Sequence, residues 1–298
     1  MKGQELKVEV ECAECILHRG LLEVKEATKD SSLQFEVISA LFQLLAREFK
    51  STTVPAYLGT ERDRLIKRMT GNPDPYSEMK RKSNQEALRV LPSAEELIWK
   101  ENAPESRFRK ACLCSMVANV MEPDIPGHEF RYQDIEELVK RAEEELAIDD
   151  LDHIFDYAKG AERVLYLTDN AGEIAFDKLL VQELKQLGAQ VTVAVKGGPI
   201  INDATLQDAR SVGIDELADD VITTGADAVG LIPEECSPTF MNTYDSVGLV
   251  VAKGMGYVET LTELELKIPH ALLLRTKCQP VANFLNVEKG KNVAKLIH

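Results

Sequence analysis

The sequence has no apolar run that approaches the roughly 20 residues needed to span a bilayer. Its first residues, MKGQELKVEVEC, lack the apolar core of a secretory signal peptide. Basic charge is also scarce, because 35 Lys and Arg face 50 Asp and Glu, for a formal net charge of −15. We therefore expect a cytoplasmic protein that binds neither a membrane nor a nucleic acid, since phosphate backbones require a basic face.

Three common phosphate-site signatures are missing as well. There is no G-x-x-x-x-G-K-[ST], which excludes a P-loop. The glycines at 254 and 256 lack the third glycine of G-x-G-x-x-G, which argues against a dinucleotide fold. Ala171 stands at the second position after Asp169, where phosphatases with an aspartyl nucleophile usually carry an Asp. A covalent aspartyl-phosphate is therefore disfavoured.

Cysteine is infrequent, with six residues among 298. Without a secretion signal, they favour thiols or a metal site over a disulfide scaffold. Cys12, Cys15 and His18 share a broad face if they are helical. The two cysteines could bind zinc, cycle as a redox dithiol, or be small residues buried on an amphipathic helix. We expect them to lie in a helical domain, away from a site at strand ends.

A change of pattern along the chain predicts two domains. Residues 1–159 read mostly as helix, and residues 160–298 alternate strands with helices, so the predicted boundary is at Gly160. Proline sets two boundaries within the helical part. Residues 53–60 are expected to be a loop around Val54-Pro55, and Leu91-Pro92-Ser93 is expected to separate two helices.

The most informative stretch covers residues 163–205. An apolar run at 164–167 predicts a buried strand, helically spaced leucines before Gly188 predict a helix, and a second apolar run at 191–195 predicts the next strand. Such a βαβ pattern builds a parallel sheet, so the fold class is α/β. In open sheets of this class, ligands bind beyond the carboxyl ends of the strands.

Three further apolar runs, at 220–225, 247–252 and 270–274, predict more strands, and polar residues follow all five. Asp169 and Asn170 follow the first strand, and Asp203 comes shortly after the second. A single Asp would more often cap a helix, but two Asp and an Asn at one sheet edge make an all-oxygen site for a hard divalent cation. Cations follow the second, fourth and fifth strands. This separation suits a metal on one side of a phosphoryl group and lysines on the other, and it predicts metal-assisted hydrolysis.

Four short segments carry a resemblance to a known family: DNAGE at 169–173, GGPIINDA at 197–204, KG at 253–254 and KCQPVA at 277–282. Together they resemble the DUF89 family of ARMT1-like, metal-dependent damage-control phosphatases. The CxxC pair at 12–15, with residues 74–76 and 82–84, is similar to the CxxC-bearing branch of that family, which is common in archaea. The resemblance covers nearly the whole chain and implies a helical N-terminal domain against a three-layer α/β/α domain with a mainly parallel sheet.

The resemblance also implies a site. Its metal ligands are Asp169, Asn170 and Asp203, and its candidate catalytic residues are Asp169, Asp203 and the phosphate-side lysine, Lys277. The cofactor would be Mg²⁺, Mn²⁺, Co²⁺ or Ni²⁺, and the substrate a small phosphorylated metabolite, often a sugar phosphate. The candidate substrate contacts are Asn119, Glu173, Lys196, Lys253, Gly254, Arg275 and Thr276.

The sequence departs from the family pattern in two places. Residues 255–257 read Met-Gly-Tyr where relatives tend to have Gln-Gly-Asn, and residues 119–122 read Asn-Val-Met-Glu where relatives tend to have Gly-Asn-x-Ile-Asp. These changes bear on substrate identity more than on metal binding.

Two other function classes compete with a phosphatase. A non-catalytic metal- or nucleotide-binding regulatory protein would keep the Asp-Asn-Asp ligands and leave the lysines unused. A carboxyl methyltransferase is disfavoured, because no Gly-rich loop follows the first strand to receive a nucleoside cofactor. The sequence predicts no particular substrate, metal or oligomeric state.

Overall fold

The computed structural model describes residues 5–118 and 135–298. Seven strands form one sheet: Leu146–Asp149 (β1), Arg163–Leu167 (β2), Gln190–Val195 (β3), Asp220–Thr223 (β4), Leu249–Lys253 (β5), His270–Arg275 (β6) and Asn292–Ile297 (β7). Their order is β1-β7-β6-β5-β2-β3-β4. Strands β2 to β6 are parallel, whereas β7 runs antiparallel to β6 and parallel to β1.

The helices fall into three groups. The first group is α1 (Cys12–Ala27), α2 (Ser31–Glu48) and α3 (Pro55–Thr70). The second is α4 (Ser77–Trp99), α5 (Pro104–Ala118), α6 (Ile135–Glu144), α7 (Leu151–Gly160), α8 (Glu173–Gln186) and α9 (Leu206–Val212). The third is α10 (Pro238–Tyr244), α11 (Met255–Leu261) and α12 (Gln279–Leu285), preceded by a 3₁₀ turn at Pro233–Glu235.

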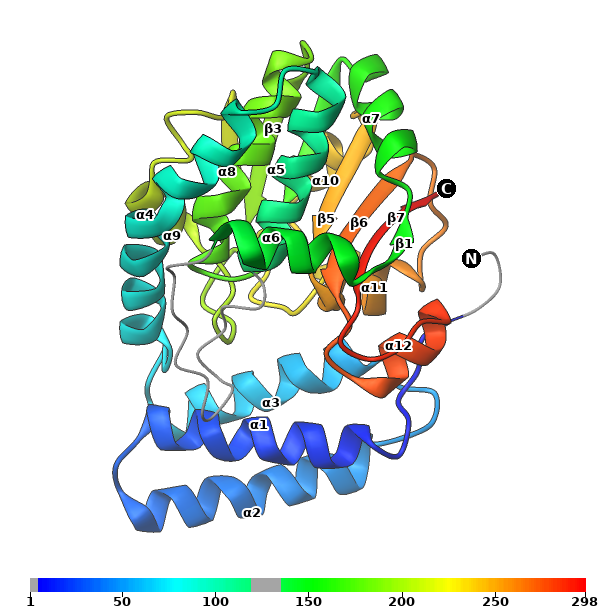
Figure 1. Ribbon diagram of the computed structural model, residues 1–298. Coiled ribbons are helices and arrows are strands. Elements are labelled where there is room, and N and C mark those ends of the chain that lie inside the picture. The colour runs from blue at the N-terminus through cyan, green and yellow to red at the C-terminus, as the bar shows by residue number, and fades with distance from the viewer. Residues whose placement is uncertain (1–4, 119–134) are drawn as a thin grey trace.

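Alternate residues along the strands face two separate hydrophobic cores, as the pleat of a sheet requires. Tyr166 and Val193 pack in the core on the side of α4 to α9. Leu165 and Ala194 pack in the core on the side of α10 to α12. The sheet is therefore covered on both faces, which confirms the predicted α/β/α layers (Figure 1).

Helices α1, α2 and α3 form a separate layer across the carboxyl ends of the parallel strands, at the bottom of Figure 1. They bury small clusters of their own, one around Ile16 and Leu58 and another around Val24, Val37 and Ile66. This layer and the sheet edge face each other, so residues of both can line one pocket.

The predicted boundary at Gly160 does not coincide with the division that the structure shows. Helices α4 to α7 share the large core with the sheet, and β1 is an edge strand bonded to β7. The helices of residues 1–159 therefore contribute to two layers, and α1 to α3 are the ones that lie apart. Amphipathic pattern alone does not say which partner covers an apolar face.

Both proline boundaries also differ from the prediction. Pro55 is the first residue of α3, where a missing N–H costs nothing, so residues 55–60 are helical. Pro92 lies inside the continuous helix α4. It is exposed, whereas Leu91 and Ala94 beside it are buried, and their packing retains the helix across the break.

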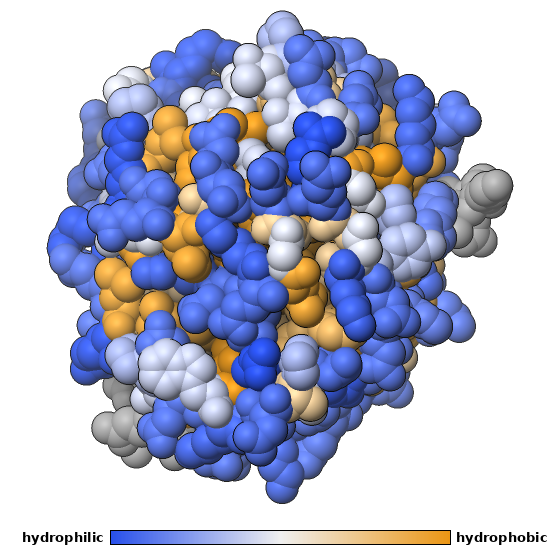
Figure 2. Space-filling model, turned by 90° about the horizontal axis from the view of Figure 1, so that it is seen from above, coloured by the Kyte–Doolittle hydropathy of each residue, from blue (hydrophilic) through white to orange (hydrophobic). Residues whose placement is uncertain are grey.

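None of the described helices is long and apolar enough to cross a membrane. Figure 2 looks at the end of the molecule opposite the α1–α3 layer, and hydrophilic side chains there divide the apolar surface into separate areas.

Candidate active site

A pocket of about 500 Å³ lies between the α1–α3 layer and the carboxyl ends of the parallel strands. Strands β2 and β5 are neighbours there, but the chain leaves β2 towards β3 and leaves β5 towards β6. Such a switch point opens a crevice in which α/β proteins bind ligands. The pocket lining includes Asp169, Asn170, Asp203 and Lys277.

Backbone pairing joins the two segments that carry the predicted metal ligands. The N–H of Ala204 donates to Asp169 O over 2.8 Å, and the N–H of Ala171 donates to Asn202 O over 2.9 Å. Asn170 and Asp203 face each other across this short antiparallel bridge. The loop after β2 and the loop after β3 are thus held together, and this brings Asp169, Asn170 and Asp203 close to one another.

The side chains at this point offer hard oxygen donors. The Asn170 amide nitrogen is 3.0 Å from Asp169 Oδ2 and 3.5 Å from Glu173 Oε2. Because the nitrogen faces carboxylates, the amide oxygen is the atom that could coordinate a cation. The described residues hold no cluster of three or more His, Cys, Asp and Glu suited to a metal. Two carboxylates with an amide would fit Mg²⁺ or Mn²⁺ better than a soft metal.

Gly254 keeps this space open. A Cβ at position 254 would lie 2.0 Å from Asp169 Oδ2, and the glycine has φ +86°. Both the contact and the dihedral exclude a side chain here. Because Gly254 has no side chain, it leaves room for the Asp169 carboxylate.

Lys196 lies beneath the pocket and is almost fully buried. Its Nζ donates to Gly230 O over 2.8 Å, lies 3.5 Å from Asp203 Oδ2 and stands 4.6 Å from the Tyr257 ring centroid. Burial lowers the pKa of Lys196, but Tyr257, Asp203 and Asp169 more than offset this and hold it above its usual value. Lys196 is therefore a permanent cation beside one predicted metal ligand.

Lys253 and Glu173, both predicted substrate contacts, bind each other inside the protein. The Nζ of Lys253 is 2.6 Å from Glu173 Oε1 and 2.8 Å from Asp177 Oδ1, and it donates to Ser115 O. Tyr166 donates to the same Asp177 oxygen over 2.7 Å. Burial, together with Glu173, raises the pKa of Asp177 to about 6, against the opposing effect of Lys253. The cluster supports the pocket from below, because Glu173 also faces the Asn170 amide.

The structure places Arg275 and Lys277, the two cations predicted at the end of β6, in different surroundings. Arg275 Nη1 lies 2.6 Å from Oε2 of Glu145, which directly follows α6, and Arg275 does not line the pocket, whereas Lys277 does. The Thr276 hydroxyl between them is buried and donates to the carbonyl of Glu288. Residues two apart on an extended segment would point the same way, but the chain turns towards α12 after β6, and Arg275 and Lys277 do not. Asn119 lies outside the described residues.

Residues 82–84, part of the family resemblance, support the DNAGE turn. The N–H of Gly172 donates to Asn84 Oδ1 over 2.7 Å, and Asn84 Nδ2 donates to Asp208 Oδ1 over 2.8 Å. A Cβ on Gly172, at φ +80°, would meet Ser83 Cβ at 2.9 Å. Helix α4 therefore fixes the turn that follows Asp169 and Asn170.

Cys12 and Cys15 line the same pocket as Asp169 and Asp203. The expectation that they lie away from the strand ends is therefore wrong, because α1 crosses directly beneath those ends. Burial raises the pKa of the Cys12 thiol, so it is a poor thiolate in this state.

Sequence reasoning missed Glu259, Cys278 and Arg19, which also line the pocket. Burial raises the pKa of Glu259 to about 7, and Arg19 opposes the shift. A signal was present, because Glu259 comes one helical turn after Met255 and Gly256 on α11, and all three residues line the pocket.

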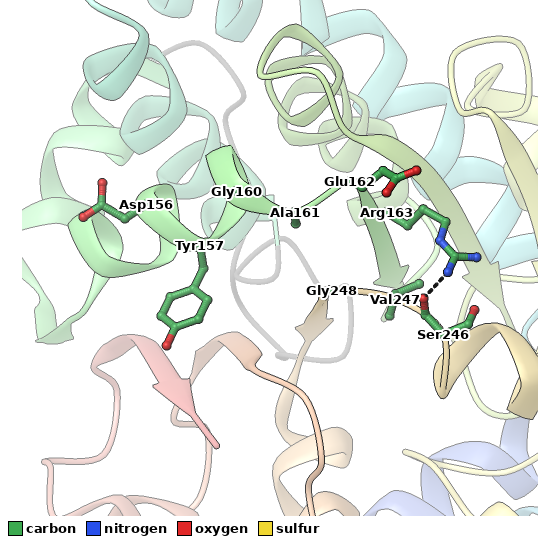
Figure 3. Close-up of a pocket in the computed structure, with 9 residues that line it drawn as sticks. All are labelled: Asp156, Tyr157, Gly160, Ala161, Glu162, Arg163, Ser246, Val247 and Gly248. Atoms are coloured by element: carbon green, nitrogen blue, oxygen red, sulfur yellow. Dashed lines mark hydrogen bonds between the residues drawn. The ribbon is translucent and has the colours of Figure 1, made fainter.

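A second pocket of about 500 Å³ lies at the opposite, amino-terminal ends of β2 and β5 (Figure 3). It is lined by residues such as Asp156, Tyr157 and Arg163, and the Arg163 guanidinium donates to Ser246 O over 2.5 Å. This pocket has no pair of carboxylates held together by backbone pairing, and it offers control positions for tests of the first.

Comparison with known proteins gives consistent results. A family model described as the damage-control phosphatase ARMT1-like domain matches residues 8–293. The chain is 36% identical to a damage-control phosphatase of Archaeoglobus fulgidus, over 98% of this chain and 100% of that protein. It is 38% identical to an uncharacterised protein of Methanocaldococcus jannaschii, over 98% of this chain and 96% of that one. The crystal structure of a DUF89 family protein from Pyrococcus horikoshii matches with a TM-score of 0.87 at 32% identity, covering 97% of this chain and 99% of that chain.

Proposed function

The chain belongs to the damage-control phosphatase ARMT1-like family, and on this premise we propose that it is a metal-dependent phosphatase that hydrolyses small phosphorylated metabolites. The observation that carries the proposal is the backbone pairing that brings Asp169, Asn170 and Asp203 together on the pocket wall. Two carboxylates and an amide would hold a divalent cation, with Mg²⁺ and Mn²⁺ favoured by oxygen donors and Co²⁺ or Ni²⁺ as further candidates.

When bound, the cation supplies Lewis-acid polarisation of a phosphoryl oxygen and a water of lowered pKa. The protein supplies the rest. The carboxylates of Asp169 and Asp203 bind the cation at the strand ends. Lys277 on the pocket wall binds phosphoryl oxygens. Lys196 stays cationic beside Asp203, 3.5 Å from its carboxylate.

The pocket volume supports a substrate larger than phosphate alone. About 500 Å³ falls within the range of small-molecule sites. Polar and charged residues such as Arg19, Glu259 and Gln279 also line the pocket. A hydroxyl-rich group, as in a sugar phosphate, fits such a lining.

The test is a phosphatase assay on a generic phosphate ester, with protein freed of metal by chelator and then titrated with Mn²⁺. Activity should require Mn²⁺, and Asp169→Asn or Asp203→Asn should lower kcat/KM by at least about 100-fold, the scale of a lost electrostatic group in a transition state. Asp156→Asn, in the opposite pocket, is the matched control and should behave as wild type. Full activity in excess chelator or in either site variant would refute the proposal. Tight Mn²⁺ binding without hydrolysis of any phosphate ester would instead favour a metal-binding regulatory protein.

A further inference from the structure

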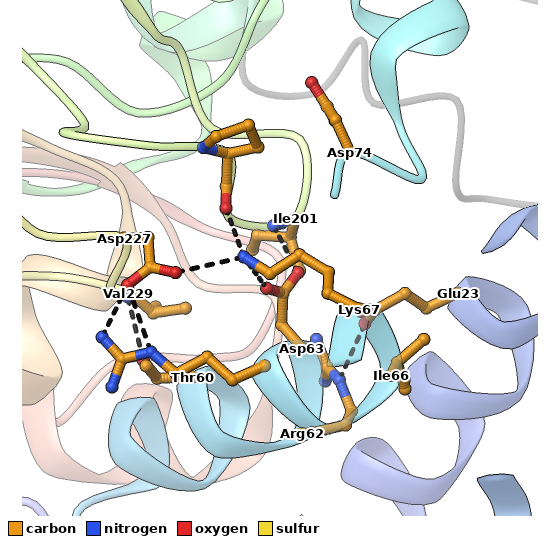
Figure 4. Close-up of polar contacts among 12 residues, drawn as sticks. Glu23, Thr60, Arg62, Asp63, Ile66, Lys67, Asp74, Ile201, Asp227 and Val229 are labelled. Carbon is orange, nitrogen blue, oxygen red and sulfur yellow. Dashed lines mark hydrogen bonds and ion pairs between the residues drawn. The ribbon is translucent and has the colours of Figure 1, made fainter. Parts of the chain in front are cut away.

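One face of α3 holds the two loops that follow β3 and β4. Thr60, Asp63, Arg64 and Lys67 recur at helical spacing, so they share this face. The Thr60 hydroxyl accepts from the N–H of Val229 over 3.0 Å. Arg64 lies 2.8 Å from Asp227 Oδ1, and Lys67 lies 3.3 Å from the other oxygen of that carboxylate (Figure 4).

Asp63 contacts the loop that carries Asp203. Its Oδ1 accepts from the N–H of Ile201 over 2.8 Å, and its Oδ2 lies 2.7 Å from Lys67 Nζ. Lys67 also donates to the carbonyl of Pro199. Asp63 is fully buried, and Figure 4 shows its side chain pointing from α3 to Ile201. One carboxylate and one ammonium group thus hold residues 199 and 201 from the helical layer.

The held residue has a strained backbone. Ile201 has φ +39°, which is rare for any residue but glycine and rarer still for a β-branched one. It is the second residue of a tight turn closed by the Asp203 N–H, which donates to Ile200 O over 3.0 Å. Positive φ at this turn position favours Gly, Asn or Asp. Strain of this kind persists where surrounding contacts enforce it, and it clusters at functional sites.

We propose that Asp63 is a positioning residue, which holds Ile201 in this strained turn and thereby places Asp203 beside Asp169 as a metal ligand. The inference rests on the proposed function. Asp63 does not line the pocket, so it acts through the turn and not on substrate. The helical layer thus reaches the metal site through the Asp63 carboxylate and its partner Lys67.

Mn²⁺ affinity, measured by calorimetric titration of folded protein, provides the test. Asp63→Ala should weaken Mn²⁺ binding at least tenfold. Asp63→Asn keeps an acceptor for the Ile201 N–H and should stay within about threefold of wild type. Arg64→Ala removes ion pairs from the same face of α3 and does not contact residues 199–203, so it is the matched control and should leave the affinity unchanged.

Replacing Ile201, the strained residue, by glycine tests whether Asp63 positions the turn or only stabilises the fold in general. Glycine adopts positive φ without cost, so in an Ile201→Gly background Asp63→Ala should weaken Mn²⁺ binding less than threefold. A merely structural Asp63 would give the same loss in both backgrounds. If Asp63→Ala does not fold, Lys67→Met, which keeps Asp63 but removes its cation, should weaken binding three- to tenfold.

Wild-type affinity in folded Asp63→Ala, or in folded Lys67→Met, would overturn the inference. So would an equal loss in Arg64→Ala. Asp203→Asn distinguishes this failure from failure of the proposed function. If Asp203→Asn loses Mn²⁺ and Asp63→Ala does not, positioning by Asp63 is refuted and the metal site stands. If Asp203→Asn also binds Mn²⁺ normally, the metal assignment itself falls.

Discussion

Among single residues, the lysines near the site differ in what surrounds them. Lys196 and Lys253 are buried against carboxylates, whereas Lys277, in the loop between β6 and α12, lines the pocket. A buried lysine held by fixed carboxylates cannot reach a substrate without breaking those ion pairs. Lys277 is therefore the lysine that we expect to contact the transferring phosphoryl group.

Lys277→Ala should lower kcat/KM by roughly 2–4 kcal/mol, because it removes a donor that stabilises the transition state. Its Mn²⁺ affinity should stay the same or rise, since a positive charge has left the neighbourhood of the cation. Lys289→Ala, another lysine of the pocket lining, is the control for charge alone. An untouched rate, or a sharp fall in Mn²⁺ affinity, would show that Lys277 acts on the fold and not on the phosphate.

His270 provides a pH-dependent contribution to stability. It is fully buried, with Nε2 2.7 Å from the Tyr244 hydroxyl and Nδ1 2.8 Å from Ile268 O, so the neutral ring has both nitrogens satisfied. Burial lowers the pKa of His270 to about 4, against the opposing effect of Ile268 O. The unfolded chain therefore binds the extra proton between about pH 6.5 and 4, and stability falls as the pH drops through this window.

Urea unfolding at pH 7.5 and pH 5 should reveal this contribution. Between pH 7.5 and pH 5, the free energy of unfolding should fall by about 2 kcal/mol more in the wild type than in His270→Asn. This difference follows from the size of the His270 pKa shift. All other titrating groups are common to both proteins, so they cancel in the difference. Parallel losses in the two proteins would mean that His270 is protonated in the folded state at pH 5.

Some site residues could be predicted from the sequence because their position after a strand fixes their location, and others could not because helix packing decides where their side chains point. Asp169, Asn170 and Asp203 directly follow strands, and strand ends in a parallel sheet meet at one edge whatever else packs around them. Glu173, Lys253 and Arg275 also lie near strand ends, but packing of α5, α6 and α8 decides where their side chains point. That packing follows from three-dimensional contacts that a single sequence does not encode locally.

At the scale of secondary-structure elements, α1 presents both cysteines of the CxxC pair to the pocket. We expect Cys12→Ser/Cys15→Ser to keep Mn²⁺ affinity within about twofold and to retain turnover, because the expected ligands are oxygens and thiols prefer softer metals. Melting should occur earlier, since Cys12 is buried. Cys236→Ser, outside this pocket, controls for the loss of a thiol. Loss of Mn²⁺ binding without a change in melting would place the thiols in the metal site.

The prediction of elements succeeded where the pattern was long or strongly marked. The five parallel strands were expected from apolar runs. Helix α10 likewise carries a strong local signal, because Ser237 caps it and Pro238 is its first residue. Strand β1 was missed because its four residues sit at the end of an acidic helical pattern. Strand β7 was also missed; it lies between β1, which is distant in sequence, and β6, to which it is antiparallel. Short strands of this kind owe their conformation to partners more than to local pattern.

At the scale of the whole molecule, a bound cation should stabilise the fold. A ligand that binds the folded state alone adds RT ln(1 + [L]/Kd), which is about 2.7 kcal/mol at a free concentration about 100 times Kd. Mn²⁺ should therefore raise the melting temperature of the wild type by several degrees, whereas Asp203→Asn should show no such rise. An equal rise in both would indicate general screening of the net charge of −15 instead of a specific site.

The position of β1 at the sheet edge has a consequence for synthesis on the ribosome. β1 pairs with β7, yet α7 to α12 and five other strands separate the two along the chain. The ribosome therefore releases β1 long before its partner exists. Until β7 emerges, one edge of β6 also stays unpaired, and an open edge can bind strands of other chains. We therefore expect a nascent chain of this protein to be more prone to aggregation before β7 emerges than after β7 has paired with β1 and β6.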